Sequence, residues 1–354
     1  MNTPRVDFTL QTITPLFLSG AEQTPELRPA SVRGALRYWL RALTDAGNVS
    51  QLQEAESAVF GQTDFGSPVI VRLSGTPQPM TDFDLKRDES KINKHGVYEQ
   101  LQNSGHNYLY YSTKLGMHKP DGNNRVPYKP AESFTLSLRL NPSSAKQTDL
   151  LLRANRAMWC LTNLGGLGSR AHRCAGNIKV SACSSHNLNE NLSELFPTSA
   201  TTTLTELKTH LETVLQSIKR ATRSSKYDVI HPDECRVWVF TRNEWKKWED
   251  VVEFIGKEMK TFRAVQANRN TINSVFGVPI LHGGPGFPLN RRSSPLWLKV
   301  GQFSDGKYYG VATLFKSEFT QGNATVGGGY GHIENFITTR LATTSSNGQE
   351  VIYK

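Results

Sequence analysis

The sequence of 354 residues has no run of about 18 apolar residues, the length that a helix needs to cross a bilayer. Its first twenty residues alternate like a strand and lack the charged start and continuous apolar block of a secretory signal. It contains only four cysteines, and none of them forms a C-x-x-C pair. Zinc knuckles and thioredoxin-like motifs are therefore excluded, and we expect four reduced thiols in a cytoplasmic protein.

Familiar catalytic motifs are also missing. Neither H-E-x-x-H, typical of zinc proteases, nor G-x-S-x-G, typical of serine hydrolases, occurs, and the nine histidines are scattered. No glycine is followed, after four spacers, by the G-K-[ST] of a phosphate-binding P-loop. The sequence therefore predicts no catalytic residue, no bound metal and no cofactor.

Positive charge, by contrast, is in excess. Lys and Arg number 41 against 31 Asp and Glu, which gives a formal net charge of +10. Residues 150–189 and 259–304 contain five and six Lys or Arg, respectively, and no acidic residue. The excess favours a polyanion such as nucleic acid or an anionic membrane, and the two stretches, which would not repel phosphate, favour such a partner over an ordinary basic surface.

The hydrophobic pattern predicts a first unit of β-α-β-β-α-β order over residues 1–190. Strands are expected at 5–13, 68–73, 133–140 and 177–183, and helices at 31–44 and 146–163. This order is that of a ferredoxin-like fold, of the α+β class. The segment at about 75–131 is too long for a hairpin, and we interpret it as a partly helical insertion that either reaches a ligand or is a solvated insert.

A Ser-, Thr- and Asn-rich stretch at 184–203 is expected to link this unit to a second one over residues 204–354. The second unit is predicted to have helices near 204–221, 243–260 and 331–342, and strands at 236–241, 295–300 and 308–315. We interpret it as a second, more divergent ferredoxin-like domain, although no sequence repeat connects the two halves.

A glycine-rich segment at 165–176, GGLGSRAHRCAG, separates the last predicted helix and strand of the first unit. A dinucleotide-binding fingerprint follows a strand and precedes a helix, whereas here the order is reversed and Ala171 replaces the third glycine. Glycines allow backbone N–H groups to approach another chain closely, and Arg170, His172 and Arg173 add donors. The loop is thus predicted to contact a sugar–phosphate backbone, the alternative being a helix cap followed by a packed loop.

The first predicted helix carries a stripe of arginines. Arg33, Arg37 and Arg41 recur at every fourth position beside its apolar arc, and Arg28 lies close to the helix N-terminus at Ser31. A helix N-terminus with arginines nearby favours anions. The alternative is a solvated helix flank whose arginine stems cover apolar surface.

Several of these motifs together resemble the RAMP superfamily of CRISPR proteins. They are PLF at 15–17, ELRP at 26–29, SVRGALRYW at 31–39, Glu56 through Phe60-Gly61, and the glycine-rich loop. Within the superfamily the pattern is most similar to the first-numbered subunits of the Cmr complex, the type III-B effector. GVPI at 277–280 and RRSSPL at 291–296 resemble their second-domain pattern, whereas His172, Cys174 and Ala175 replace the arginines and aromatics usual in the loop.

The resemblance implies two ferredoxin-like domains, assembly with other Cmr subunits around a guide RNA, and cleavage by subunits other than this one. We therefore predict a non-catalytic RNA-binding subunit of a type III-B CRISPR (Cmr) ribonucleoprotein that engages guide or target RNA in antiviral defence. The residues expected to bind single-stranded RNA are Arg28, Arg33, Arg37, Arg41, Gly165, Gly166, Gly168, Arg170, His172, Arg173, Lys179, Arg291 and Arg292.

Two alternatives remain open at this point. A metal-independent endoribonuclease would need a general base and acid, for which His172, Arg173 and Lys179 are candidates. Aspartates of the insertion that could assist it are Asp82, Asp84, Asp88 and Asp121. A scaffold without RNA contacts would instead turn its basic surface toward an acidic neighbouring subunit.

Overall fold

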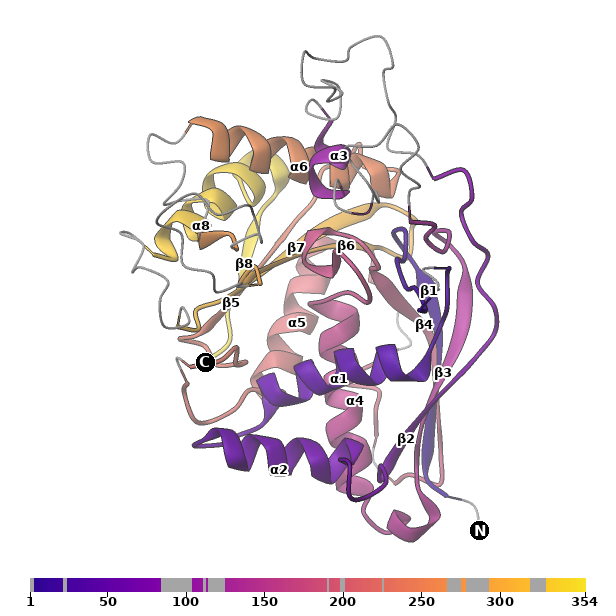
Figure 1. Ribbon diagram of the computed structural model, residues 1–354. Coiled ribbons are helices and arrows are strands. Elements are labelled where there is room, and N and C mark those ends of the chain that lie inside the picture. Colours follow the sequence, from indigo (N-terminus) through magenta and orange to yellow (C-terminus); the bar gives the residue numbers. More distant parts are fainter. Residues whose placement is uncertain are drawn as a thin grey trace, which may run out of the picture.

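The computed structural model describes residues 3–21, 24–83, 104–110, 113, 125–189, 191–197, 201–224, 226–265, 275–277, 293–318 and 329–354. Within them the protein is a mixed α/β molecule built on two four-stranded antiparallel sheets (Figure 1). No helix in these ranges is long and apolar enough to cross a membrane. Site candidates that lie outside the described residues are Arg291, Arg292, Asp84, Asp88 and Asp121.

The first sheet has the strand order β2-β3-β1-β4. Its strands are β1 (Arg5–Thr12), β2 (Val69–Ser74), β3 (Ser133–Leu140) and β4 (Ile178–His186). Side chains alternate across it, so that Val6, Phe8 and Leu10 are fully buried while their neighbours face outward. The buried face packs on α1 (Pro29–Leu43), α2 (Val49–Phe60) and α4 (Thr148–Asn163).

The second sheet repeats this arrangement, with the order β6-β7-β5-β8. Its strands are β5 (Cys235–Phe240), β6 (Leu296–Gln302), β7 (Tyr308–Phe315) and β8 (Gln349–Val351). The helices are α5 (Leu204–Ile218), α6 (Trp248–Val265) and α8 (Gly331–Phe336), which continues as a π-helix over Ile337–Leu341. In each sheet the last strand pairs with the first, and the third lies between the first and the second.

The predicted elements of the first sheet are confirmed to within three residues at each end, and those of the second to within five. Helix α2 and strand β8 were not anticipated. Helix α2 begins at an N-cap, where the Asn48 side chain accepts the N–H of Gln51 at 3.0 Å. Its sequence signal is this cap and not a long apolar stripe.

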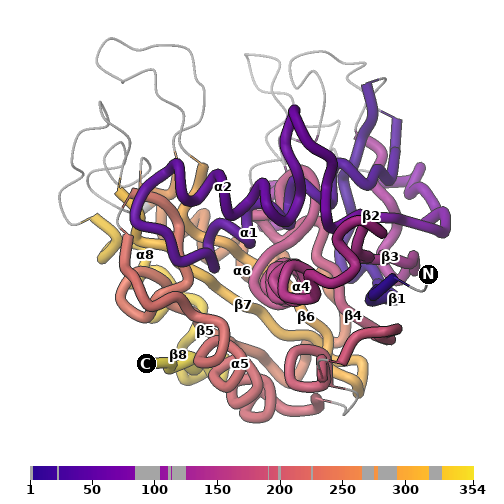
Figure 2. Tube along the Cα trace, turned by 90° about the horizontal axis from the view of Figure 1, so that it is seen from below, coloured from indigo at the N-terminus to yellow at the C-terminus, as the bar shows by residue number. Residues whose placement is uncertain are grey.

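One apolar core runs from the first sheet into the second. Helix α4 lies in the middle of the molecule in both views (Figures 1 and 2). Its buried Trp159 belongs to the same cluster as Phe8 of the first sheet and Phe315 of the second. Trp39 of α1 also meets Trp297 of β6, with ring centroids 5.2 Å apart. The two sheets are therefore packed together through side chains.

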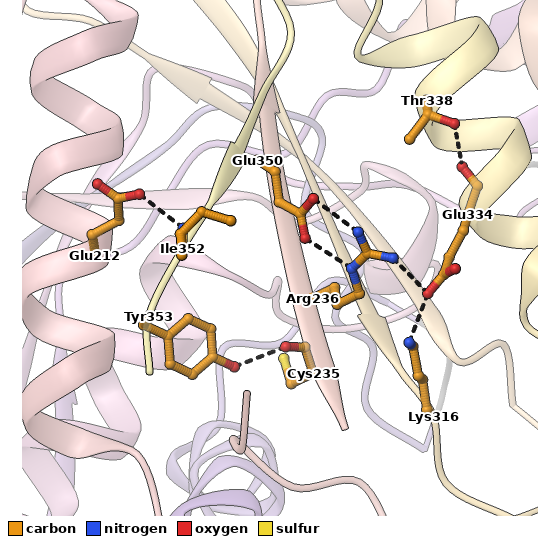
Figure 3. Close-up of polar contacts among 9 residues, drawn as sticks. All are labelled: Glu212, Cys235, Arg236, Lys316, Glu334, Thr338, Glu350, Ile352 and Tyr353. Carbon is orange, nitrogen blue, oxygen red and sulfur yellow. Dashed lines mark hydrogen bonds and ion pairs between the residues drawn. The ribbon is translucent and has the colours of Figure 1, made fainter. Parts of the chain in front are cut away.

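Side-chain contacts add to the backbone pairing of the short strand β8 with β5. The Arg236 guanidinium makes two contacts of 2.8 Å with the Glu350 carboxylate and a third with Glu334 (Figure 3). Glu334 also pairs with Lys316 at 2.7 Å, and these neighbouring cations lower its pKa although burial opposes the shift. The network thus joins β5, β8 and α8, and Tyr353 adds a hydrogen bond to the carbonyl of Cys235 at 2.9 Å.

Part of the predicted insertion packs against the second sheet's helices. Helix α3 (Gly105–Tyr110) lies on α6 (Figure 1). A Cβ on Gly256 would collide with the Gly105 backbone, so the two helices meet through bare backbone. The Glu253 carboxylate accepts the hydroxyl of Ser104 at 3.1 Å and the N–H of His106 at 2.9 Å. The described part of this segment therefore joins the two halves, whereas contact with a ligand stays a prediction.

Candidate nucleic-acid interface

The glycine-rich loop follows α4 and crosses to the second sheet before β4 begins. Its Cys174 N–H donates to the Leu298 carbonyl at 2.9 Å, and the Asn177 side-chain oxygen accepts the N–H of Val300 at 2.8 Å. Both bonds are made to β6, the edge strand of the second sheet. The loop thus supplies hydrogen-bond partners that an edge strand otherwise lacks.

The glycines of the loop are needed for close packing on protein atoms. A Cβ on Gly165 would lie 2.5 Å from the Trp39 ring, and one on Gly166 would lie 2.9 Å from the Ala175 carbonyl. Gly168 has a φ of +84° and lies beneath the Phe17 carbonyl. These contacts give the three glycines a structural role, and their contact with RNA stays a prediction.

Arg173 reaches from the loop into the second half of the chain. Its guanidinium donates to the carbonyls of His172, Leu296 and Phe276 and to the Ser294 hydroxyl, at 3.0–3.3 Å. None of these four oxygens belongs to a carboxylate. Burial, followed by the charges of Arg170 and Arg263, lowers the pKa of Arg173 to about 9.

Arg170 and Arg263 complete a group of positive charges around Arg173. The Arg170 Nε donates to the Leu109 carbonyl at 2.7 Å, and Arg263 of α6 donates to the Tyr108 hydroxyl at 2.7 Å. We call Arg170, Arg173 and Arg263 the junction arginines. No sequence motif includes Arg263, and its only sequence signal was its place in the acid-free stretch 259–304.

His172 faces protein. Its ring stacks on Trp297 with centroids 3.5 Å apart, and its Nδ1–H donates to the Ser294 carbonyl at 2.9 Å. Burial, followed by the charge of Arg173, lowers the pKa of His172 to about 3. The ring is therefore neutral at physiological pH.

Two lysines lie where β4 approaches β6. The predicted candidate Lys179 donates to the Gln302 side chain at 2.7 Å, and burial lowers its pKa. Lys299 was missed. It is 2% exposed, donates to the Ile178 carbonyl at 3.1 Å, and has its pKa lowered by burial to about 7. A lysine inside the apolar run PLWLKV at 295–300 was the signal that could have identified it.

The arginine stripe of α1 divides into two kinds of residue. Arg37 and Arg41 both pair with Glu56 of α2, and Arg37 also donates to the carbonyls of Phe60 and Gly61 at 2.9 and 2.7 Å. Arg33 makes no hydrogen bond or ion pair with the described residues. Arg37 and Arg41 therefore join α1 to α2, whereas Arg33 is available to a ligand.

Arg28, the remaining candidate of this region, precedes α1. Its guanidinium donates to the Ser19 carbonyl at 3.3 Å and lies 3.6 Å from the Glu26 carboxylate. These contacts are exposed, so the structure leaves its binding role as a prediction. Arg28, the α1 stripe and the loop thus do not form one continuous row of unpaired cations.

Two of the described residues considered for catalysis lie in different surroundings. Asp82 is exposed, whereas His172 is half-buried and stacks on Trp297. Across the described ranges, no group of three or more His, Cys, Asp or Glu is placed to hold a metal ion. The endoribonuclease alternative stays a prediction to be tested by experiment.

Sequence comparison places this arrangement among known proteins. The matching family model is the RAMP superfamily, over residues 9–179. The CRISPR system Cmr subunit Cmr1-2 of Pyrococcus furiosus is 30% identical over 189 residues, which are 49% of this chain and 93% of that protein. The CRISPR system Cmr subunit Cmr1-1 of the same organism is 24% identical over 329 residues, 88% of each chain.

Solved structures share the fold. The crystal structure of Cmr1 from Pyrococcus furiosus in its apo form has a TM-score of 0.64 and 23% identity, and covers 98% of both chains. A chain of the cryo-EM structure of the Type III-B Cmr-beta bound to cognate target RNA has a TM-score of 0.55 and 13% identity, with 90% of this chain and 97% of that chain covered.

Proposed function

We propose that this chain, which belongs to the RAMP superfamily and within it to the Cmr1 subunits, is a non-catalytic RNA-binding subunit of a type III-B CRISPR ribonucleoprotein. It would assemble with other Cmr subunits and bind single-stranded guide or target RNA. Its two sheets, with their shared strand order, would belong to two ferredoxin-like domains over 1–190 and 204–354.

The proposal depends chiefly on the junction arginines. Arg170 and Arg263 both depress the pKa of Arg173, so the three positive charges repel one another. Arg173 is surrounded by carbonyl and hydroxyl oxygens, which solvate its charge without neutralising it. A phosphate near this group would relieve the repulsion, and a chain of phosphates would do so with a strong dependence on salt.

The relatives support the choice of partner. The similar chain of known structure belongs to a Cmr complex bound to cognate target RNA. In such an assembly we expect the junction arginines and Arg33 to contact the RNA backbone. Binding would then depend mainly on phosphate contacts and little on base identity.

The test uses the purified full-length chain and end-labelled single-stranded RNA across a salt series. Native gels report binding and denaturing gels report cleavage, without metal and then with Mg²⁺. We expect a salt-sensitive shift with intact RNA. If the gels show neither a shift nor a cleaved product, RNA binding by this chain is overturned, and a discrete product lost in His172→Gln would make it an endoribonuclease.

Arg173→Gln tests the junction arginines themselves, because glutamine can still donate to a carbonyl but carries no charge. Loss of one phosphate contact should reduce the slope of log affinity against log salt by about 0.7 on a single strand. Lys146→Gln, at an exposed lysine without a partner among the described residues, is the control. Equal salt slopes for wild type, Arg173→Gln and Lys146→Gln would mean that RNA does not bind at the junction arginines.

A further inference from the structure

A cavity of about 540 Å³ lies where the edge strand β4 meets β6, β7 and α5. It is on the β4 side of the junction and is lined by neither the junction arginines nor α1. Pockets of 300–1,000 Å³ are typical for small ligands and cofactors. The cavity is thus large enough for a ligand with one ring system and a charged group.

The charge of the cavity has a single sign. Lys179 and Lys299 both contribute to its wall, and none of the described residues that line it is an Asp or Glu. The Lys179 ammonium donates to the Gln302 side chain at 2.7 Å, which leaves donor capacity for a ligand. Lys299 lies deeper, and its ammonium is held by the Ile178 carbonyl. Two lysines without an acid favour an anionic ligand.

The wall formed by β4 also contains an irregularity. Leu10 of β1 pairs with Val180 and Thr9 pairs with Ala182, so Ser181 is an extra residue that forms a β-bulge. The Ser181 side chain is exposed, and its hydroxyl has no hydrogen-bond partner among the described residues. Bulges redirect a side chain and occur often beside functional sites. The bulge therefore places a free hydroxyl at the cavity, close in sequence to Lys179.

The remaining wall is aromatic and apolar. Phe303 and Tyr309 both line the cavity, with ring centroids 4.6 Å apart, and Phe196 lines it as well. Such a surface suits a flat ring, because aromatic side chains stack on bases of any identity. The cavity thus combines a surface for a base with donors for a phosphate.

We propose that this cavity binds a nucleotide through its phosphate and its base. Lys179 and Ser181 would donate to the phosphate, Lys299 would add positive potential from beneath, and Phe303 with Tyr309 would contact the base. The site is separate from the junction arginines. Its ligand is either a free nucleotide or a terminal nucleotide of an RNA strand, since both offer the same chemistry.

Isothermal titration calorimetry of the full-length chain tests the site, with AMP as the probe and adenosine as the matched ligand without phosphate. We expect AMP to bind at least tenfold more tightly than adenosine. Lys179→Met, which keeps the length of the side chain, should weaken AMP at least tenfold with unchanged thermal stability, and the exposed Lys146→Met should have no effect. Equal binding of both ligands, or equal AMP affinity in all three proteins, would overturn the proposal.

Competition then identifies the source of the nucleotide. A fluorescent AMP analogue is displaced with single-stranded RNA that carries a terminal phosphate and with the same RNA without it. Selective displacement by the phosphorylated strand would assign the cavity to an RNA end, and no displacement would assign it to a free nucleotide. Retained RNA binding without AMP binding overturns this site alone, whereas AMP binding without RNA binding overturns only the proposed RNA-binding function.

Discussion

His172 of the glycine-rich loop stacks on Trp297 of β6 with ring centroids 3.5 Å apart and ring planes at 26°. The same indole packs on Trp39 of α1 and donates its N–H to the Tyr38 hydroxyl at 3.2 Å. A loop that was predicted to bind phosphate therefore also joins the first helix to the second sheet. An RNA contact made by this loop would therefore be coupled to the packing of the two halves.

The pKa of His172 makes stability depend on pH. Burial lowers this pKa from 6.5 to about 3, so between these values the unfolded chain binds a proton that the folded chain does not. Stability should therefore fall as the pH decreases from about 6.5 toward 3. Thermal melts of wild type and His172→Phe, which keeps an aromatic ring on Trp297, should show a shallower pH profile in the variant. Parallel profiles would show that His172 titrates normally.

Replacing either of two helical glycines by alanine should change the stability of the protein, in opposite directions for the two. Gly256 of α6 faces the Gly105 backbone, so Gly256→Ala should destabilise the protein by about 1–3 kcal/mol through overpacking. Gly34 of α1 has nothing within 4 Å of an added Cβ, so Gly34→Ala should stabilise it by about 0.5–1 kcal/mol. Urea unfolding measures both changes. If Gly256→Ala were neutral, α3 would not be docked on α6 in solution.

Two arginines one turn apart on α1 should separate RNA binding from stability. Arg33 has no partner among the described residues, so Arg33→Gln should weaken single-stranded RNA binding and lower its salt slope while leaving the melting temperature unchanged. Arg37 clamps α2 through Glu56 and two carbonyls, so Arg37→Gln should cost about 1.5–3 kcal/mol of stability. Native gels and urea unfolding on both variants test the pair. If Arg33→Gln lowered stability and Arg37→Gln weakened RNA binding instead, Arg33 would be the structural residue and Arg37 the RNA contact.

The sequence was sufficient for most of the fold because its elements have strong local periodicity. Phe134, Leu136 and Leu138 alternate in a way that only a half-buried strand explains, and β3 has the expected bounds. Helix α2 was missed because its start depends on the Asn48 cap. The contact of Gly105 with Gly256 was beyond prediction, because no local pattern relates two glycines that are far apart in the chain.

For the candidate site, the sequence identified donors but not their acceptors. Arg37 and Arg173 were selected as phosphate ligands from their type and spacing, and the structure shows both of them donating to protein oxygens. An arginine that binds a carbonyl and one that binds a phosphate have the same local sequence signal. Only the tertiary arrangement distinguishes them, which is why the charge-only substitution of Arg173 is the informative one.

Lys299 provides the last prediction. It is buried, donates one hydrogen bond to Ile178, and has its pKa lowered by burial from 10.5 to about 7. Between these values the unfolded chain holds a proton that the folded chain has lost, so the cost of this lysine is greatest near pH 7 and decreases toward pH 10. Lys299→Met removes that cost while filling a similar volume.

The stability of Lys299→Met relative to wild type should therefore be more favourable at pH 7 than at pH 10. Urea unfolding at the two pH values measures the difference, and the exposed Lys146→Met serves as the control with no pH-dependent change. An equal difference at both pH values would mean that Lys299 keeps its charge in the folded state. In that case a counter-anion would have to be bound beside it, and the cavity formed with Lys179 would be the place to seek it.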